Sequence, residues 1–393
     1  MTPHKAVVVS GCSSHYFHYL QDLLLSFFAC GAAQHYDFAV LDGGLEADQL
    51  EWLRRAGVRS VIQPEWPISG LEGQPEWYKV CLGRPFFPQF FTDWEVIVYL
   101  DADTWLQTRE ALDAAVEGAW QDGFAACPMT DRCLWPLTVQ TNVVFSMQWH
   151  RNCLEQYYGP DIAQQFQLHP ILSGSLFAGR RDAPHWAVWQ QRLIQGLQRK
   201  VHYDLDQASM TLAIHQSQLP THFLSLQHHW IGHLGQIGLD TRTGTYVEPY
   251  LPHRPISSIS LAAHAKSEPV IVRTTDGRRL SRLLRYQQQE SRFSLNVTLA
   301  GVQQSVDGVA SARFRQTLRE AIHSDILLLD TLADIAQHAP KCVQVDILQR
   351  APDETALMIS QLRNAEYACY AMDDGSALLG IRQDFGRNHF HIL

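Results

Sequence analysis

The chain has 393 residues, a length typical of two domains or of one large domain with an appendage. Its 31 Lys and Arg residues against 40 Asp and Glu residues give a formal net charge of −9, which excludes the basic surface expected of a nucleic-acid binder. The longest apolar run near the N-terminus, residues 23–31, is far too short to cross a bilayer, and residues 1–6 leave no room for a signal peptide. We therefore expect a cytoplasmic protein with no transmembrane segment, with peripheral association at a membrane surface left open.

The first hundred residues alternate short apolar runs with segments of helical period. We expect strands at residues 6–10, 38–41, 58–62 and 94–100. Between these strands, apolar residues recur every three and four positions, which predicts helices near residues 15–28, 45–55 and 76–91. Strands that alternate with helices are typical of a parallel sheet covered by helices, so the sequence predicts an α/β fold.

The same alternation continues beyond residue 100. Further apolar runs lie at residues 124–127, 142–147 and 171–177, helices are expected near 184–198 and 205–215, and a strand at 256–264. A polar stretch at 278–292 marks the expected boundary between a large domain, residues 1–285, and a small α/β region of unknown role, residues 286–393. In that region we expect helices near 312–323, 330–338 and 354–363, a strand at 342–348, and hairpin-like strands to the end.

The strand expected at residues 94–100 is followed by two carboxylates, Asp101 and Asp103. Residues i and i+2 share one face of a strand, and ligands of open α/β sheets bind at the carboxyl ends of the strands. The two side chains can therefore converge on one hard divalent cation, which would bridge a diphosphate and neutralise its charge as it leaves. A strand-end Asp can also simply cap the next turn or helix. Two carboxylates after a run with no other charge, however, need a counter-ion, because burying an uncompensated charge is costly.

The string Asp101-Ala102-Asp103-Thr104 is open to two enzymatic interpretations. It resembles the nucleophile motif of the haloacid-dehalogenase-like phosphatases, in which the first Asp attacks phosphorus and the second acts as acid and base. That motif usually lies on the first strand of its domain, whereas three strands are expected before it here. Its closing acidic pair would be Asp373 and Asp374, but Asp-Asp-Gly is equally a hairpin turn.

The second interpretation covers about the first 270 residues, where several ordered features resemble glycosyltransferase family 8, the family of glycogenin and of bacterial lipopolysaccharide galactosyl- and glucosyltransferases. Leu100-Asp101-Ala102-Asp103-Thr104 resembles the family's metal-binding signature. Val8-Val9-Ser10-Gly11 with Tyr16 resembles its nucleoside-binding strand and loop, and Tyr78-Lys79-Val80 resembles its basic donor-contacting segment.

The remaining features of the resemblance concern the sugar and the diphosphate. Residues 172–177, with Ser173-Gly174-Ser175, resemble the sugar-lining strand, for which Asn142-Val143-Val144-Phe145 is a rival candidate. The pair Asp206-Gln207 resembles the family's sugar-binding pair at the start of a helix. His264 and Lys266 resemble its late metal ligand and its diphosphate-binding lysine.

The resemblance implies a GT-A fold, a Rossmann-like mixed sheet flanked by helices, with the C-terminal α/β region as an appendage. It implies a metal-dependent glycosyltransferase that moves a hexose, with retention, from a nucleotide diphosphate sugar such as a UDP-sugar to a hydroxyl of a glycan, lipid-linked or protein acceptor. Mn²⁺ or Mg²⁺ would be held by Asp101, Asp103 and His264. The donor would be bound by Val9, Ser10, Tyr16, Lys79, Asp101, Ser173, Gly174, Ser175 and Lys266, and Asp206 and Gln207 would act at the reaction centre.

Other interpretations of the sequence stay open. A GT-A-like domain that binds a sugar nucleotide without turnover is the non-enzymatic alternative; the intact acid pair disfavours it. His229 and His233 have the spacing of zinc ligands on a helix, but Gly232 favours a loop beside the sugar or acceptor site. Trp66, Trp77 and Trp135 are candidates for stacking on sugar rings as well as for ordinary packing.

Overall fold

The computed structural model of the chain describes residues 5–130 and 142–286, without the side chains of 142–148, and the backbone of five strands further on. The chain divides into two compact units, one of Met1–Gly235 with Thr245–Ala262 and one of Gln236–Gly244 with Ala263–Leu393. Residues 236–244 and 263–285, which the sequence analysis assigns to the large domain, group with the second unit. The functional boundary at residue 285 stays a prediction.

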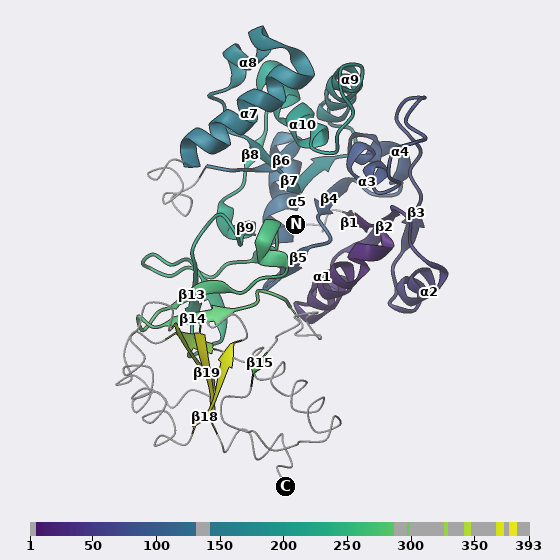
Figure 1. The fold of residues 1–393 in the computed structure, drawn as a ribbon. Helices are drawn as coiled ribbons and strands as arrows, with labels where there is room; N and C mark the ends of the chain where they lie inside the picture. Colours follow the sequence, from purple (N-terminus) through teal and green to yellow (C-terminus); the bar gives the residue numbers. More distant parts are fainter. Residues whose placement is uncertain are drawn as a thin grey trace. The chain divides into compact units, whose positions relative to one another are not determined.

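A central sheet organises the first unit, with strand order β3-β2-β1-β4-β7-β6-β8 (Figure 1). Neighbours from β3 to β4 pair in parallel, whereas β7 pairs antiparallel with both β4 and β6. The sheet is therefore mixed, and the predicted α/β class is confirmed. Its strands are β1 (Ala6–Cys12), β2 (Asp37–Asp42), β3 (Ser60–Ile62), β4 (Val96–Leu100), β6 (Phe124–Pro128), β7 (Leu172–Arg180) and β8 (His222–Phe223).

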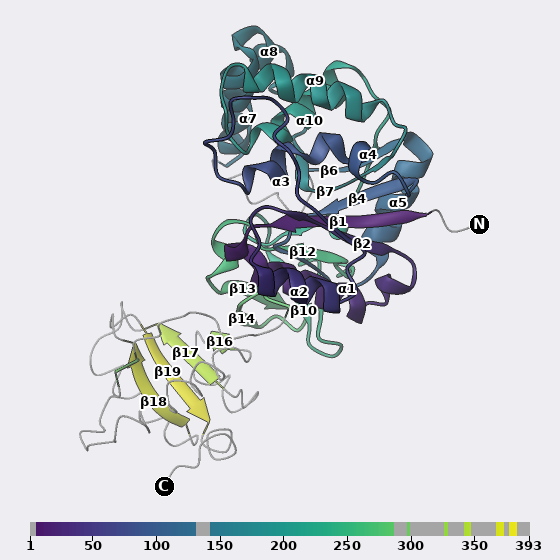
Figure 2. The same ribbon diagram turned by 90° about the vertical axis from the view of Figure 1, so that its right-hand side faces the viewer.

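Helices cover both faces of this sheet. In Figure 2, α1 and α2 lie on one side of the strands and α9 and α10 on the other. The central strands β1 and β4 are buried at every residue, and their alternate residues point to opposite faces, so that Val7, Ile97 and Tyr99 share a core with Trp186 and Trp189 of α9. The helices are α1 (Phe17–Ala29), α2 (Ala47–Arg55), α3 (Tyr78–Leu82), α4 (Phe87–Phe90), α5 (Glu110–Asp122), α7 (Asn142–Tyr158), α8 (Pro160–Phe166), α9 (His185–Leu197) and α10 (Leu205–Gln216).

The single helix predicted over residues 76–91 is wrong in one respect. The segment forms α3, then a 3-10 turn at Arg84–Phe86, then α4. Gly83 weakens the helix at this point, and Pro85 and Pro88 lack the backbone N–H that a continuous helix requires. The break matters for the site, because it lies at the residue whose side chain crosses to the end of β4.

Two other expected strands are also corrected. Residues 142–147, expected to be extended, form the first turns of α7, so the rival candidate for the sugar-lining strand is a helix. The strand expected at 256–264 is shorter: β12 (Ser258–Ser260) pairs with β5 (Thr104–Leu106) and β9 (Trp230–Ile231) in a small sheet, and β11 (Thr245–Val247) lies in the same unit. His264 lies instead in a 3-10 helix, Ala263–Lys266, of the second unit.

The second unit contains a sheet in which the strands follow the order β10-β13-β14-β16-β17-β19-β18-β15. They are β10 (Ile237–Asp240), β13 (Val270–Thr274), β14 (Arg279–Arg282), β15 (Val297–Thr298), β16 (Ile326–Leu328), β17 (Cys342–Asp346), β18 (Tyr367–Met372) and β19 (Ala377–Arg382). The antiparallel pairing of β18 with β19 confirms the expected hairpin. Asp373 and Asp374, Trp135 and the helices expected near 312–323, 330–338 and 354–363 lie outside the described residues.

Within the part of the chain that the structure describes, no helix is long and apolar enough to span a membrane.

Candidate active site

The acid pair predicted at the end of β4 lies beside β7. The two strands are antiparallel and Leu100 is in register with Leu176; beyond that pair, the backbone N–H of Asp101 donates to the Ser175 carbonyl at 3.0 Å. Asp101 is two residues beyond Tyr99 and has the same orientation, toward the layer formed by α3, α9 and α10. Its side chain is 27% exposed. Strand parity and the β4–β7 ladder therefore place one carboxylate of the pair against the helical layer.

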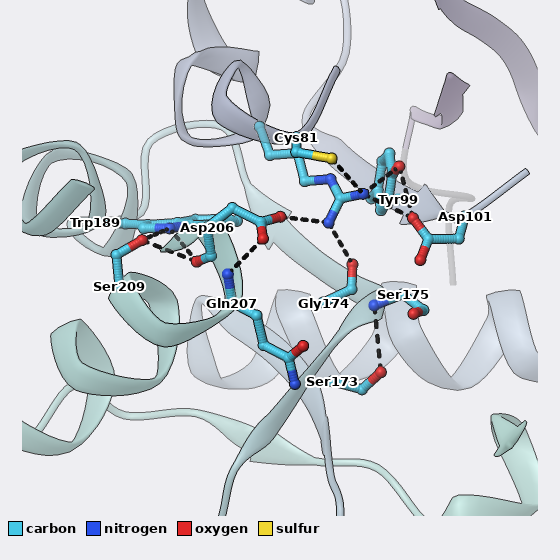
Figure 3. Close-up of polar contacts among 11 residues, drawn as sticks. Cys81, Tyr99, Asp101, Ser173, Gly174, Ser175, Trp189, Asp206, Gln207 and Ser209 are labelled. Atoms are coloured by element: carbon cyan, nitrogen blue, oxygen red, sulfur yellow. Dashed lines mark hydrogen bonds and ion pairs between the residues drawn. The ribbon is translucent and has the colours of Figure 1, made fainter. Parts of the chain in front are cut away.

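A buried arginine, Arg84, connects the elements that meet at this point (Figure 3). Its Nη2 donates to the Asp101 Oδ1 atom and to the Tyr99 hydroxyl, both at 2.7 Å. Its Nη1 donates to the Gly174 carbonyl at 3.1 Å and to a carboxylate oxygen of Asp206. The guanidinium carbon also lies 4.2 Å from the centre of the Tyr99 ring. One side chain thus ties β4, β7 and the start of α10 together.

The electrostatics of this group follow from its burial. Burial alone would lower the pKa of Arg84, but the Asp206 and Asp101 carboxylates outweigh it and hold that pKa well above its usual value. Burial raises the pKa of Asp206 to about 6, against the opposing effect of Arg84, and Asp101 adds to the rise. Two carboxylates share one guanidinium, so the group carries one net negative charge when both are ionised. A site of this kind favours the approach of a cation.

The predicted sugar-lining segment lies on β7 beside Arg84. Ser173 is buried, and its hydroxyl accepts a hydrogen bond from the Ser175 backbone N–H at 3.2 Å. A Cβ atom on Gly174 would lie 3.2 Å from Arg84 Nη1 and 3.5 Å from the Gln207 Cβ. The absence of a side chain at Gly174 therefore allows Arg84 and α10 to pack against the β7 backbone.

The predicted pair Asp206-Gln207 lies in the first turn of α10, where Asp206 is buried. The Gln207 backbone N–H donates to Asp206 Oδ1 at 2.6 Å, while its side-chain amide lies 3.4 Å from the Met129 sulfur. Figure 3 shows that amide pointing away from the Arg84 guanidinium. The pair therefore has two separate roles in the structure: Asp206 binds Arg84, and Gln207 is directed away from it.

The predicted nucleoside-binding residues lie on β1 and the loop after it. Val9 and Ser10 are buried, Tyr16 is half-buried, and β1 is parallel to β4 with Val9 in register with Tyr99. The carboxyl ends of β1 and β4 are consequently neighbours. A Cβ atom on Gly11 would lie 2.7 Å from a methyl group of Val80, so this glycine lets α3 pack closely on the end of β1.

Lys79, the predicted donor-contacting base, is paired with Glu76 at 2.7 Å and lies 5.2 Å from the Trp66 ring centre. Its role toward a donor stays a prediction. Arg84 is the basic residue that contacts Asp101 of the acid pair, and sequence reasoning missed it. The available signal was the Gly83-Arg84-Pro85 string, which breaks the helix 17 residues before Asp101 and turns the arginine toward the sheet.

A metal site is only partly assembled. Among the described residues, no group of three or more His, Cys, Asp or Glu side chains is gathered closely enough to hold a metal. The side-chain contacts of Asp101 to Arg84 and Tyr99 are made by Oδ1, and Figure 3 shows the second oxygen pointing away from Arg84. His229 is fully buried, neither of its ring nitrogens has a hydrogen-bond partner among the described residues, and Asp101 acts on it electrostatically. Burial lowers the pKa of His229 to about 4, which keeps the imidazole neutral, the form that binds metals.

The other residues of the predicted ligand sets lie as follows. Asp103 is half-buried in the turn after β4, and its carbonyl accepts from the Leu261 backbone N–H at 2.8 Å. His264 is exposed and Lys266 half-buried, both in the second unit. The segment with the two histidines at zinc-ligand spacing forms a 3-10 turn (Leu226–His228) and then β9, so it is not a continuous helix and the zinc interpretation is wrong.

Comparisons with known proteins give structural neighbours alone, since no protein-family model and no curated protein matches the chain. The solved structure of the bifunctional glycosyltransferase WbbM is 16% identical with a TM-score of 0.39, and the match covers 58% of this chain and 40% of that one. The galactosyltransferase LgtC, in complex with donor and acceptor sugar analogues, is 11% identical with a TM-score of 0.40, over 66% of this chain and 87% of that one. An active-site mutant of LgtC matches with 12% identity and a TM-score of 0.41, over 65% and 87%. The chain thus spans about two fifths of the WbbM chain, and we base the functional proposal on the geometry of the site.

Proposed function

We propose that the chain is a metal-dependent glycosyltransferase that moves a hexose from a nucleotide diphosphate sugar, a UDP-sugar in the first instance, to an acceptor hydroxyl with retention. The observation that carries the proposal is the Arg84 bridge. It joins the acid at the end of β4, the backbone of β7 and the first turn of α10 into one polar site within an otherwise apolar core. These elements carry the residues expected to bind the metal and the sugar and to act at the reaction centre.

In this reaction a bound Mn²⁺ or Mg²⁺ would supply charge neutralisation of the leaving diphosphate. Asp101 and Asp103 are hard oxygen ligands that suit such an ion. The third ligand would be a histidine. The sequence argument favours His264, whereas His229 has a neutral imidazole with no hydrogen-bond partner among the described residues and is affected electrostatically by Asp101. Lys79 and Lys266 would neutralise phosphate oxygens.

The remaining residues orient the substrates. Arg84 fixes Asp101 and Asp206 by charge-assisted hydrogen bonds, so that neither carboxylate reorganises during the reaction. Ser173, Ser175 and Gln207 would hold the donor hexose, and Val9, Ser10 and Tyr16 the nucleoside. Since Asp206 is already bound to Arg84, it is poorly placed to serve as the free carboxylate base that an inverting reaction needs, which supports retention.

The phosphatase alternative is weakened by the position of the motif. In the haloacid-dehalogenase-like phosphatases the motif usually lies on the first strand of the domain, whereas β4 comes after β1, β2 and β3 in the chain and pairs antiparallel with β7. The non-enzymatic alternative, a scaffold that binds a sugar nucleotide, can be distinguished from an enzyme only by a measurement of turnover.

Calorimetry of UDP and a panel of nucleotide sugars, with and without Mn²⁺, tests the proposal. We expect metal-dependent binding that Asp103→Ala weakens at least about tenfold and that the exposed α8 variant Asp161→Ala leaves unchanged. His229→Ala and His264→Ala, compared side by side, identify the third ligand by which of them weakens binding of Mn²⁺. If no nucleotide binds, the glycosyltransferase proposal is wrong; phosphate release from simple phosphoesters that Asp101→Asn abolishes would establish the phosphatase.

A further inference from the structure

Three aromatic side chains, Trp77, Tyr78 and Tyr203, cluster at the surface of the first unit. The Trp77 ring centre lies 4.5 Å from that of Tyr78 and 5.3 Å from that of Tyr203, and the two tyrosine rings are 6.1 Å apart. Trp77 is 38% exposed and Tyr203 is 44% exposed, whereas Tyr78 is half-buried against the core. We call these three residues the aromatic platform.

The platform residues are connected to the packed part of the first unit. Tyr203 immediately precedes Asp204, which accepts hydrogen bonds from the Tyr157 hydroxyl and from the ring of His202. Trp77 and Tyr78 are the N-cap and the first residue of α3, which packs against α10. Tyrosine and tryptophan side chains have only two rotatable χ angles, so such rings lose little entropy when they bind a ligand.

The platform lies close in sequence to the proposed reaction centre on both of its elements. Tyr203 is three residues before Asp206, and the chain continues from Trp77 and Tyr78 through α3 to Arg84, which binds Asp206. The nucleoside is expected at the end of β1, on which α3 packs through Val80, two residues after Tyr78. A molecule on the platform would therefore lie beside the donor site, and Tyr203 is the platform residue that leads to Asp206 on the sugar side.

The chemistry of the platform matches a pyranose ring. One face of a hexose presents aliphatic C–H groups that pack on aromatic rings, and its rim presents hydroxyl groups that need polar partners. The platform supplies the rings, and the Glu76 carboxylate, 50% exposed, and the His202 ring, 37% exposed, lie next to it in the chain. A mostly apolar surface with a few polar groups at its edge is typical of small-molecule sites.

We propose that the aromatic platform binds a sugar ring of the acceptor, so that the acceptor is a glycan with a ring beyond the one that carries the attacked hydroxyl. The inference rests on the proposed function and specifies the substrate class of the same site. A protein or simple alcohol acceptor would have no sugar ring to place there.

The test measures binding of lactose, maltose and cellobiose, by saturation-transfer NMR with titration, in the presence of UDP and Mn²⁺. We expect at least one disaccharide to bind the wild-type protein, and Trp77→Ala and Tyr203→Ala to weaken it about tenfold. Trp77→Phe, which keeps a ring, should retain most of the affinity. The matched control is Trp120→Ala: Trp120 is also 36% exposed but lies on α5, against the Arg180 guanidinium.

The outcomes separate this inference from the proposed function. Binding of UDP should be the same in all four variants; a parallel loss of UDP binding in Trp77→Ala would assign the platform to the nucleobase and overturn the inference. Failure of every disaccharide to bind the wild-type protein, or an equal loss in Trp120→Ala, would also overturn it. If the wild-type protein binds no UDP yet loses disaccharide binding with Trp77→Ala, the platform is upheld as a sugar-binding surface and the proposed function fails.

Discussion

Replacement of Arg84 by methionine tests the central electrostatic argument. The change removes the guanidinium but keeps an unbranched side chain, and it leaves Asp101 and Asp206 without their shared counter-ion. Arg84 and Asp206 are 7% and 5% exposed in their side chains, so solvent screens little of the resulting charge. Breaking a buried pair of this kind costs about 3–5 kcal/mol of unfolding free energy. For a unit of about 250 residues that corresponds to a fall in Tm of roughly 6–20 °C.

Protonation of Asp206 should relieve part of this penalty. With Arg84 in place its pKa is already raised to about 6, and without the guanidinium it rises further. The Arg84→Met protein should therefore lose less stability at pH 5.5 than at pH 8. The double variant Arg84→Met with Asp206→Asn should recover about half of the loss, because one of the two uncompensated carboxylate charges is gone.

Thermal and denaturant unfolding at the two pH values provide the measurement, with Arg84→Lys as the variant that keeps the charge but not the paired hydrogen bonds. A loss below about 1 kcal/mol in Arg84→Met would refute the reasoning, since a pair that matters so little cannot organise the site. Strict additivity of the two single changes in the double variant would refute it equally, because the two side chains would then not be coupled.

Three further predictions concern Asp206, Gly174 and His229. The pKa of Asp206 is about 6 instead of the usual 3.8, so its protonated form stabilises the folded state at low pH, and this stabilisation is lost as the pH rises through 6. From pH 5 to 7.5 the unfolding free energy of the wild-type protein should fall by about 1 kcal/mol relative to that of Asp206→Asn. In Gly174→Ala the new Cβ, 3.2 Å from Arg84 Nη1, should displace the guanidinium and lower turnover of a nucleotide sugar at least about tenfold, whereas Gly73→Ala, with nothing within 4 Å, should be silent. The pKa of His229 is lowered to about 4, so between pH 6.5 and 4 the unfolded state binds a proton that the folded state does not. From pH 7 to 4.5 the unfolding free energy of the wild-type protein should therefore fall by about 2–3 kcal/mol relative to that of His229→Gln. Equal pH profiles of the two proteins would contradict this.

The sequence was sufficient for the architecture of the first unit because its central strands are buried and almost entirely apolar. The run Val96–Leu100 reads as a core strand in any context, and so do β1 and β2. Errors arose where the apolar period was misleading. Residues 142–147 are apolar enough for a strand yet begin the long helix α7, and short apolar runs of this kind do not distinguish the two.

Site residues were predictable where the end of a strand determines the direction of a side chain. They were not predictable where a side chain contacts elements that are distant in the sequence. Asp101 and the start of α10 were found from local patterns alone. Arg84 was missed because its significance depends on four partners that are 15 to 122 residues away in the chain. Lys79 is also basic and lies five residues before Arg84, but it pairs with Glu76 instead of entering the core. Local spacing could not decide which basic side chain enters the core.

The two histidines illustrate the same limit. His264 was chosen because it resembles the family's late metal ligand at the end of an expected strand, but that strand ends at Ser260 and His264 lies in an exposed 3-10 helix. His229 was assigned to a loop because Gly232 argues against a helix, and a loop position gives no indication of burial. Its complete burial, with two ring nitrogens that have no hydrogen-bond partner among the described residues, is a tertiary property that no local pattern encodes.

The two oxygens of the Asp101 carboxylate have different surroundings. Oδ1 is committed to Arg84 and Tyr99, which fixes the plane of the carboxylate, while the second oxygen points away from that pair. Arg84 is fixed in turn by Asp206 and by the Gly174 carbonyl. Four oxygen partners offset the cost of burying the arginine, so the oxygen that would bind a cation is oriented before any cation or substrate arrives. Catalysis by charge neutralisation depends on such fixed groups, because a carboxylate that must reorient during the reaction stabilises the leaving diphosphate less.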